Sequence, residues 1–263
     1  MCQDGAAEFI RASFTFRRRE AMMDLTIGGE RVRQTKRTYK DSLFRDIFNN
    51  EKRLSEVYTA LAGKAAEPSE IRITTMDETF FSSEKNDVSF LVRDRHIILL
   101  EHQSTVNENM PLRLLWYIAE LYRQYVDPKA PYRGKRISLP APKFYVFYNG
   151  EEKYPAQMEL KLSDAFTVKS AKPSLELLVK VININYNKDN KLLENCKPLE
   201  EYTQFVEAVR RHIRLDAENG FKNAIKECIR NDILRDYLER KSREVMNMLI
   251  AEYDYDTDIA VQR

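Results

Sequence analysis

The stretch that decides the fold is residues 87–103, DVSFLVRDRHIILLEHQ, in which two apolar runs flank a short polar break. The runs 87–92 and 96–103 have the length and the β-branched and aliphatic content of strands. The break, Arg93-Asp94-Arg95, has the length of a hairpin loop. We therefore predict that the two runs pair as an antiparallel β-hairpin.

The length of the loop decides which side chains share a face of the hairpin. With a three-residue loop, Val92 pairs with His96, and Asp87 falls opposite Glu101. Because side chains alternate along a strand, Gln103 shares the face of both acids. Facing carboxylates repel unless a cation neutralises them, and hard oxygen ligands suit Mg²⁺. Two alternatives stay open: a two-residue loop that separates the acids, and an ordinary hairpin with solvated acidic ends.

The composition is that of a folded globular chain. Its 263 residues are 43% hydrophobic and 32% charged, and the formal net charge of +2 at pH 7 does not by itself indicate nucleic-acid binding. The sequence has no run of 18 apolar residues and no signal-peptide core, so we expect a cytoplasmic protein with no membrane partner. The scattered cysteines and histidines favour neither a disulfide framework nor a zinc site.

Positive charge is concentrated in two segments. Residues 11–40 hold nine Lys and Arg against three acids, and residues 128–150 hold five basic residues and no acid. Such segments can contact phosphates even when the total charge is near zero, or they can simply be solvated. Residues 1–37 show no clear period and are predicted to form a loosely ordered basic extension.

The pattern around the hairpin predicts a mixed α/β core followed by helices. The predicted helices cover 39–62 and 110–126, and further strands lie near 70–74, 143–150 and 175–185. From 198 to about 253 the pattern is helical, with a break at Asn219-Gly220. The order α-β-β-β-α-β-β predicts a mixed sheet with the second helix packed on one face. The core is placed at 38–195 and the helical C-terminal region at 196–263.

The predicted helix over 110–126 is amphipathic. Its apolar stripe is expected at Leu115, Ile118, Ala119, Tyr122 and Val126, and its other face at Arg113, Tyr117, Glu120 and Gln124. Trp116 is expected to pack in the core. On the hairpin, His102 alternates away from Glu101, so we expect a structural histidine.

Several segments together resemble one nuclease family. An acid on one strand, then an acid and a polar residue two apart on the next, resembles the PD-(D/E)XK arrangement. The surrounding residues are similar to the Rpn family of recombination-promoting nucleases, often labelled putative transposases. These residues are Asp41-Ser42-Leu43-Phe44-Arg45, Glu101-His102-Gln103-Ser104, Met110-Pro111-Leu112-Arg113-Leu114-Leu115, Tyr117, Leu139-Pro140, Tyr148-Asn149-Gly150 and Ala224-Ile225-Lys226-Glu227-Cys228-Ile229. The resemblance implies a restriction-endonuclease-like mixed-sheet core (α-β-β-β-α-β) with a helical C-terminal region.

The resemblance also implies roles for the hairpin residues. Asp87 and Glu101 would bind Mg²⁺ or Mn²⁺ together with the backbone carbonyl of His102. Gln103 stands where the broad superfamily has Lys, as it does in the Rpn pattern, and would orient the attacking water. The alternative for Gln103 is a strand-end side chain that bonds to the backbone.

Nucleic-acid contacts are implied outside the hairpin. Arg113 and Tyr117, four apart on one helical face, and Arg45, where the family has Lys, would contact DNA. Arg113 could instead form a salt bridge to Glu120 or to a site carboxylate. Asp41 is an additional candidate acid, or equally an acid favoured by the dipole at a helix start.

These residues favour a Mg²⁺-dependent DNA endonuclease associated with recombination or mobile elements. It would hydrolyse phosphodiesters with a metal-activated water and would need no covalent intermediate. One alternative is a non-catalytic DNA-binding or interaction module that keeps the nuclease fold, and another is a different metal hydrolase using the same acids. DNA is the expected partner, and a homo-oligomer is left open.

Overall fold

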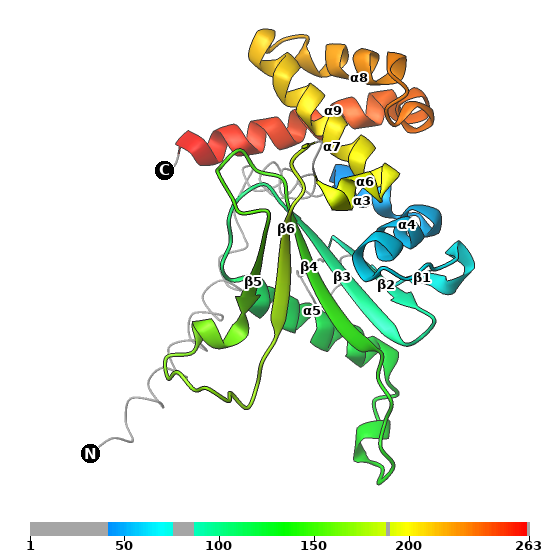
Figure 1. Cartoon of the computed structure of the whole chain (residues 1–263), viewed down its shortest axis with the longest axis vertical. Coiled ribbons are helices and arrows are strands. Elements are labelled where there is room, and N and C mark those ends of the chain that lie inside the picture. Colours follow the sequence, from blue (N-terminus) through cyan, green and yellow to red (C-terminus); the bar gives the residue numbers. More distant parts are fainter. Residues whose placement is uncertain (1–41, 76–86, 188–189, 262–263) are drawn as a thin grey trace, which may run out of the picture. The chain divides into compact units, whose positions relative to one another are not determined.

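The computed structural model describes residues 42–75, 87–187 and 190–261 (Figure 1). For residues 251–261 only the backbone is described. The basic extension predicted over 1–37 and the candidate acid Asp41 lie outside the described residues.

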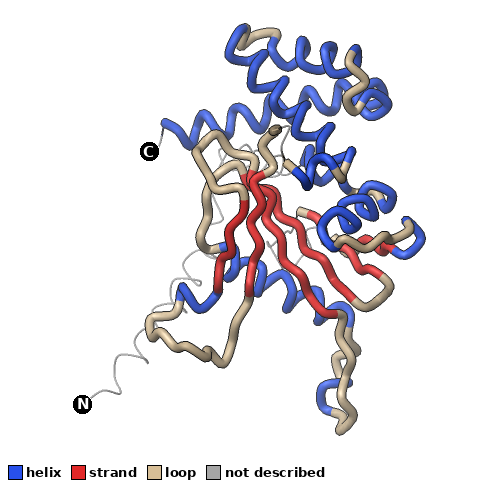
Figure 2. Tube along the Cα trace, viewed as in Figure 1, coloured by secondary structure: helices blue, strands red, loops and turns tan. Residues whose placement is uncertain are grey.

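The described strands form one mixed sheet in the order β1-β2-β3-β4-β6-β5 (Figure 2). β1, β2 and β3 are antiparallel neighbours, β3, β4 and β6 run parallel, and β5 lies antiparallel to β6 at the far edge. The strands are β1 (Ile71–Ile73), β2 (Val88–Val92), β3 (His96–Gln103), β4 (Ala141–Tyr148), β5 (Gln157–Lys161) and β6 (Leu178–Asn183). The predicted mixed sheet is confirmed.

Helices precede the sheet, join two of its strands and follow it. They are α3 (Ser42–Phe48), α4 (Glu51–Ala62), α5 (Met110–Tyr125), α6 (Lys191–Glu194), α7 (Lys197–Leu215), α8 (Gly220–Arg230) and α9 (Arg235–Val261). Short 3-10 turns lie at Pro68–Glu70 (η1), Ala130–Tyr132 (η2) and Leu162–Ala165 (η3). The architecture is the restriction-endonuclease-like α/β core with a helical C-terminal region that the sequence predicted.

Side chains alternate across β3 and divide the interior into two clusters. Leu99, on the face of Glu101, packs with Leu114 of α5. Ile98 and Leu100, on the other face, pack with residues from α3, α4, α7, α8 and α9. Helix α5 therefore packs on one face of the sheet, as predicted, and this is the face that carries the candidate acids, while the remaining long helices cover the other face.

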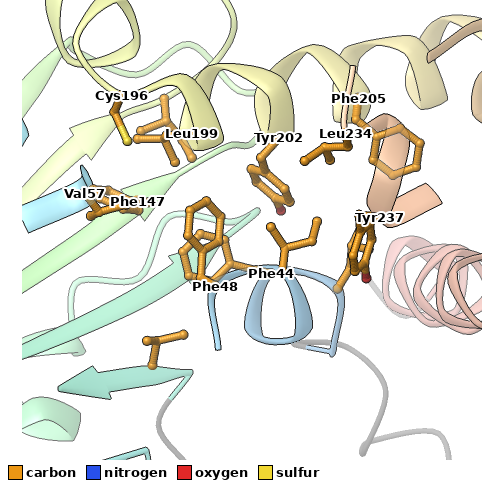
Figure 3. Close-up of a cluster of buried hydrophobic side chains, with 14 of the residues drawn as sticks. Phe44, Phe48, Val57, Phe147, Cys196, Leu199, Tyr202, Phe205, Leu234 and Tyr237 are labelled. Carbon is orange, nitrogen blue, oxygen red and sulfur yellow. The ribbon is translucent and has the colours of Figure 1, made fainter. Parts of the chain in front are cut away.

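The second cluster joins the first helix of the core to the C-terminal helices. Figure 3 shows Phe44 and Phe48 of α3 beside Tyr202 of α7, with Tyr237 of α9 nearby. The ring centroids of Phe44 and Tyr202 lie 5.4 Å apart. Residues on both sides of the predicted boundary at 195 and 196 thus share one buried core.

The prediction for residues 39–62 is wrong in one respect. It gave a single helix, whereas the structure has two, α3 and α4. The helical conformation is interrupted at Asn49 and Asn50, between α3 and α4. Asn50 has extended backbone angles, and its side-chain oxygen accepts the Arg53 N–H at 3.1 Å. This is the N-cap arrangement, which favours a new helix start over continuation.

The sheet contains one strand that the sequence did not reveal, β5. Its residues Gln157–Lys161 alternate between exposed and half-buried, with no residue fully buried. A short, polar edge strand contributes little apolar pattern, so periodicity alone could not separate it from a loop.

The buried face of α5 differs from the predicted stripe. Its buried residues include Leu114, Tyr117, Ile118 and Leu121, so Tyr117 is inside and not on the expected polar face. Trp116, expected to pack, is 47% exposed. The helix is rotated relative to the expectation because its buried face is set by contact with the sheet, not by apolar content alone.

The C-terminal helices follow the prediction with one addition. The break at Asn219-Gly220 is present, and Gly220 begins α8. A Cβ there would lie 2.8 Å from backbone atoms of Ile213, so the close approach of α8 to α7 requires glycine. A second, unpredicted break precedes α9, where Asp232 and Leu234 have positive φ angles of 62° and 47°.

Helices α7 and α8 are also joined by a charged cluster. Glu227 of α8 accepts Arg211 Nη2 at 2.5 Å and lies 2.7 Å from His212 Nε2. The Arg211 hydrogen bond, followed by that of His212, lowers the pKa of the Glu227 carboxyl below its ordinary value of 4.5.

We expect Glu227→Gln to lower the free energy of unfolding by about 1–3 kcal/mol at neutral pH, since charge-assisted hydrogen bonds are lost. Because the folded pKa lies below the unfolded value, this stabilisation is present above pH 4.5 and is lost as the pH falls through the folded pKa. Urea unfolding across this pH range measures it. Glu207→Gln, at an exposed position of α7, is the control; equal effects of the two variants would contradict the prediction.

Within residues 42–75, 87–187 and 190–261, no helix combines the length and the hydropathy required to cross a membrane.

Candidate metal centre

The register of the hairpin places Asp87 opposite Glu101. Val92 pairs with His96, as the three-residue loop predicted, and the ladder ends at the pair of Val88 with Leu100. In the loop, Arg93 and Asp94 adopt left-handed backbone angles, with φ of 53° and 52°. The Asp87 N–H donates to Glu101 Oε1 at 3.1 Å, which confirms that the two acids meet across the hairpin.

Both carboxylates are buried. Asp87 is 4% exposed and Glu101 is 0% exposed. Asp87 Oδ2 accepts the backbone N–H of His102 at 2.5 Å, and Glu101 Oε2 lies 3.2 Å from Arg113 Nη2. Burying two like charges side by side costs several kcal/mol unless cations and hydrogen bonds compensate them. The pair is therefore a strong candidate for a cation site.

Arg113 and Tyr117 of α5 lie beside the two acids. The Tyr117 hydroxyl accepts from Arg113 Nη2 at 3.0 Å and from Nε at 3.3 Å. Burial opposes the charge of Arg113, but attraction to Glu101 leaves its pKa above the ordinary value. Burial, followed by the charge of Glu101, raises the pKa of Tyr117 to about 12. Arg113 thus stays cationic and Tyr117 stays protonated.

Of the two alternatives for Arg113, the structure shows the salt bridge to a site carboxylate, Glu101. Glu120, the other candidate partner, lies 3.8 Å from Arg123 instead.

The donor set fits a hard divalent cation that keeps part of its water shell. Among the described residues, no group of three His, Cys, Asp or Glu could hold a metal ion. Mg²⁺ is commonly held by one or two carboxylates, with waters completing its octahedron. The N–H of His102 points to Asp87, and in an extended strand the carbonyl of the same residue opens to the same side. Asp87, Glu101 and this carbonyl therefore fit Mg²⁺ or Mn²⁺.

The His102 side chain lies on the other face of β3, as predicted for a structural histidine. Its ring stacks on Phe44 at 5.2 Å between centroids, and Nε2 lies 3.0 Å from the Tyr202 hydroxyl. Burial, followed by the charge of Arg210, lowers the pKa of His102 to about 3. His102 is therefore neutral at physiological pH and anchors β3 to α3 and α7.

Gln103 is half-buried and ends β3 on the face of the acids. It lines a small pocket together with Met110 of α5 and Tyr148 of β4. Its backbone carbonyl accepts the Asn149 N–H at 2.9 Å. The role of Gln103 in orienting a water stays a prediction.

One buried residue beside the strand end escaped the sequence analysis as a site residue. Asn149 is 2% exposed, yet neither side-chain atom has a hydrogen-bond partner among the described residues. Unsatisfied buried amides are rare and costly, so the amide of Asn149 is available to bind a water molecule or a ligand. The sequence signal that could have identified Asn149 is its position in Tyr148-Asn149-Gly150, one of the segments that carry the family resemblance.

Gly150, which follows, is required by close packing. A Cβ at this position would lie 2.2 Å from the Ser104 carbonyl oxygen and 2.4 Å from the Tyr148 hydroxyl. We expect Gly150→Ala to destabilise the fold by about 1–3 kcal/mol, because backbone at the end of β3 must move. Gly134→Ala, where a Cβ meets nothing within 4 Å, is the control. Equal thermal unfolding temperatures of the two variants would contradict this expectation.

Two sequence-predicted residues remain, Arg45 and Asp41. Arg45 is half-buried on α3, next to Phe44, which packs on the opposite face of β3 from the acids. Its contact with DNA stays a prediction. Asp41 lies outside the described residues.

The family described as putative transposase, YhgA-like, matches residues 80–239. The chain belongs to this family. The match to the YhgA-like family covers more than half of the chain and includes the hairpin, α5 and most of the C-terminal helices, which confirms the family resemblance seen in the sequence. No curated protein and no solved structure matches the chain.

Proposed function

We propose that this protein is a Mg²⁺-dependent DNA endonuclease that serves recombination or a mobile element. The observation that carries the proposal is the pair Asp87 and Glu101, buried and in contact at the end of the hairpin. Membership of the YhgA-like putative transposase family supports the association with mobile elements.

The chain's own residues have distinct tasks in this proposal. Asp87, Glu101 and the His102 carbonyl hold the ion, which when bound polarises the scissile phosphate and lowers the pKa of a water. Gln103, which can donate and accept hydrogen bonds but cannot act as a base at neutral pH, orients that water. Tyr117 holds the guanidinium of Arg113 beside the acids, where it can bind a phosphate oxygen.

The cysteines that the structure describes do not offer a competing nucleophile. Cys196 and Cys228 are buried and free. Burial raises the pKa of each thiol to about 12, so neither forms a thiolate at neutral pH. This supports direct attack by water without a covalent intermediate.

Cleavage of supercoiled plasmid by the full-length protein tests the proposal. We expect nicked and linear products with Mg²⁺ or Mn²⁺ and none with EDTA. A protein that leaves the plasmid intact under all metal conditions, at concentrations where it binds DNA, would contradict the nuclease.

A second candidate is a DNA-binding module that keeps the fold but does not cut. One observation favours it: Arg113 already neutralises Glu101 at 3.2 Å, as an internal cation could do permanently. Titration calorimetry separates the two candidates. Heat of Mg²⁺ binding by wild type that is lost in Asp87→Asn supports the nuclease, whereas DNA binding without metal binding supports the module.

A further inference from the structure

The loop of residues 127–139, between α5 and β4, projects beyond one end of the sheet (Figure 1). Its base is held on two sides. The Tyr122 hydroxyl of α5 donates to the Pro140 carbonyl at 2.6 Å. The Ala141 N–H donates to the Arg95 carbonyl of the β2–β3 loop at 2.8 Å. Most side chains between these two contacts are exposed, so the loop is accessible although its base is fixed.

The charge of this loop is positive and largely unmatched. It holds four cations and a single acid, Asp127. The Asp127 carboxylate is used inside the loop, because it pairs with Arg133 at 3.2 Å and accepts the Lys129 N–H at 3.0 Å. The side chains of Lys129, Lys135 and Arg136 are exposed and form no ion pair with any described residue.

Three further cations gather at the base of the loop, around His96 at the start of β3. The pKa of His96 lies below its ordinary value of 6.5. The causes are burial, followed by the charges of Lys143, Lys64 and Arg95. These cations come from β4, from the end of α4 and from the β2–β3 loop, so segments far apart in the sequence place positive charge together.

The acids at this end of the sheet do not match these cations, because they already have partners. Asp94 of the β2–β3 loop lies 2.7 Å from Arg72. Glu70 lies 2.7 Å from Arg93. The positive charge around His96 and in the loop is therefore free to attract an anionic partner.

We propose that this end of the sheet, the basic end, binds the phosphate backbone of double-stranded DNA away from the bond that is cut. The basic end consists of Lys64, Arg95, Lys129, Lys135, Arg136 and Lys143. A duplex carries one negative charge per about 1.7 Å of its axis, twice that of one strand, so it gains most from dispersed cations. Four of the six residues are lysines, which are depleted in protein–protein interfaces.

The basic end and the candidate metal centre lie at opposite ends of β3. His96 and Glu101 are five residues apart on this strand, a distance of about 16 Å. A duplex that follows β3 advances about 3.4 Å per base pair, so the two contacts are separated by about five base pairs. The inference rests on the proposed nuclease function and specifies its substrate, which is duplex DNA that extends at least this far from the cut.

The salt dependence of DNA affinity tests the inference, because each phosphate contact releases counterions. The variant is Lys129→Gln/Lys135→Gln/Arg136→Gln in the full-length protein, at three exposed positions. Fluorescence anisotropy of a labelled duplex of about 20 base pairs, in EDTA to prevent cutting, measures the affinity. The slope of log K against log salt should become about 2.7 shallower. Wild type should then lose about 40-fold more affinity than the variant between about 50 and 200 mM salt.

A matched control separates phosphate contact from a general effect of net charge. Lys52→Gln/Lys172→Gln/Lys191→Gln removes the same charge at three exposed positions outside the basic end. Its slope should stay close to that of wild type. Circular dichroism of both triple variants checks that each is folded.

The outcomes separate the inference from the function on which it rests. A basic-end variant with the slope of wild type, or equal changes in both triple variants, would overturn the inference, while metal-dependent plasmid cleavage would still support the nuclease. Single-stranded DNA that binds as tightly as the duplex, with the same change of slope, would overturn the assignment to a duplex. Wild-type protein that binds the duplex with the expected slope but never cuts would keep the basic end and overturn the nuclease.

Discussion

Glu101→Gln is expected to lower metal-dependent DNA cleavage at least roughly 100-fold, since even loss of an outer-shell partner of a metal ligand can cost that much. Glutamine has nearly the shape of glutamate but lacks the charge that a divalent cation requires. Glu101 is 0% exposed, so bulk solvent screens the change of charge poorly. Asp87→Asn should have a similar effect, because the two acids meet at the same point of the hairpin.

Plasmid cleavage measures the loss of activity, and calorimetric titration with Mg²⁺ measures the loss of metal binding. Asp94→Asn is the matched control, at the opposite end of the same hairpin, where the side chain is 69% exposed. Asn tolerates the left-handed backbone that Asp94 adopts, so this variant keeps the loop. Wild-type cleavage by Glu101→Gln would point to contamination or to a different site.

Phe44→Ala is expected to cost about 3–5 kcal/mol of folding free energy, the range for large-to-small substitution of a buried aromatic residue. Phe44 is 2% exposed, and its ring contacts those of Phe48, His102, Phe147 and Tyr202 at 4.5–6.1 Å between centroids. These partners come from α3, β3, β4 and α7. The cavity left by this substitution would therefore weaken the packing of the C-terminal helices against the sheet.

Urea denaturation of the metal-free protein measures the loss. Tyr132→Ala removes an aromatic ring of similar size at a 91% exposed position and should change the free energy by no more than about 0.5 kcal/mol. A loss below about 1 kcal/mol in Phe44→Ala would show that the surrounding helices collapse into the space.

The hairpin shows how far sequence reasoning reaches. Its two runs and three-residue break are local features, and loop length determines register. The pairing of Val92 with His96 and the meeting of Asp87 with Glu101 were predicted from these features, and the structure excludes the two-residue loop that the sequence left open.

The helices show what sequence reasoning could not predict. Helix α5 was predicted, but of its expected apolar stripe only Ile118 is buried, whereas Tyr117 is buried and Trp116 is half-exposed. Both residues are amphipathic aromatics that fit either environment, so composition could not decide between them. The N-cap at Asn50 and the edge strand β5 were missed because each depends on a few polar residues.

By itself, the sequence determined the hairpin, the α/β order of elements and the likeness to a putative transposase family, and it favoured the register that the structure shows, because strand alternation, helical periodicity and motifs are local properties of the chain. Only the tertiary structure decided that Arg113 pairs with Glu101, that His102 joins β3 to α3 and α7, and that the C-terminal helices share a core with the sheet. These contacts join residues whose closeness depends on how helices pack on the sheet. How helices pack depends on the fit between whole surfaces, and a local pattern of residues does not specify that fit.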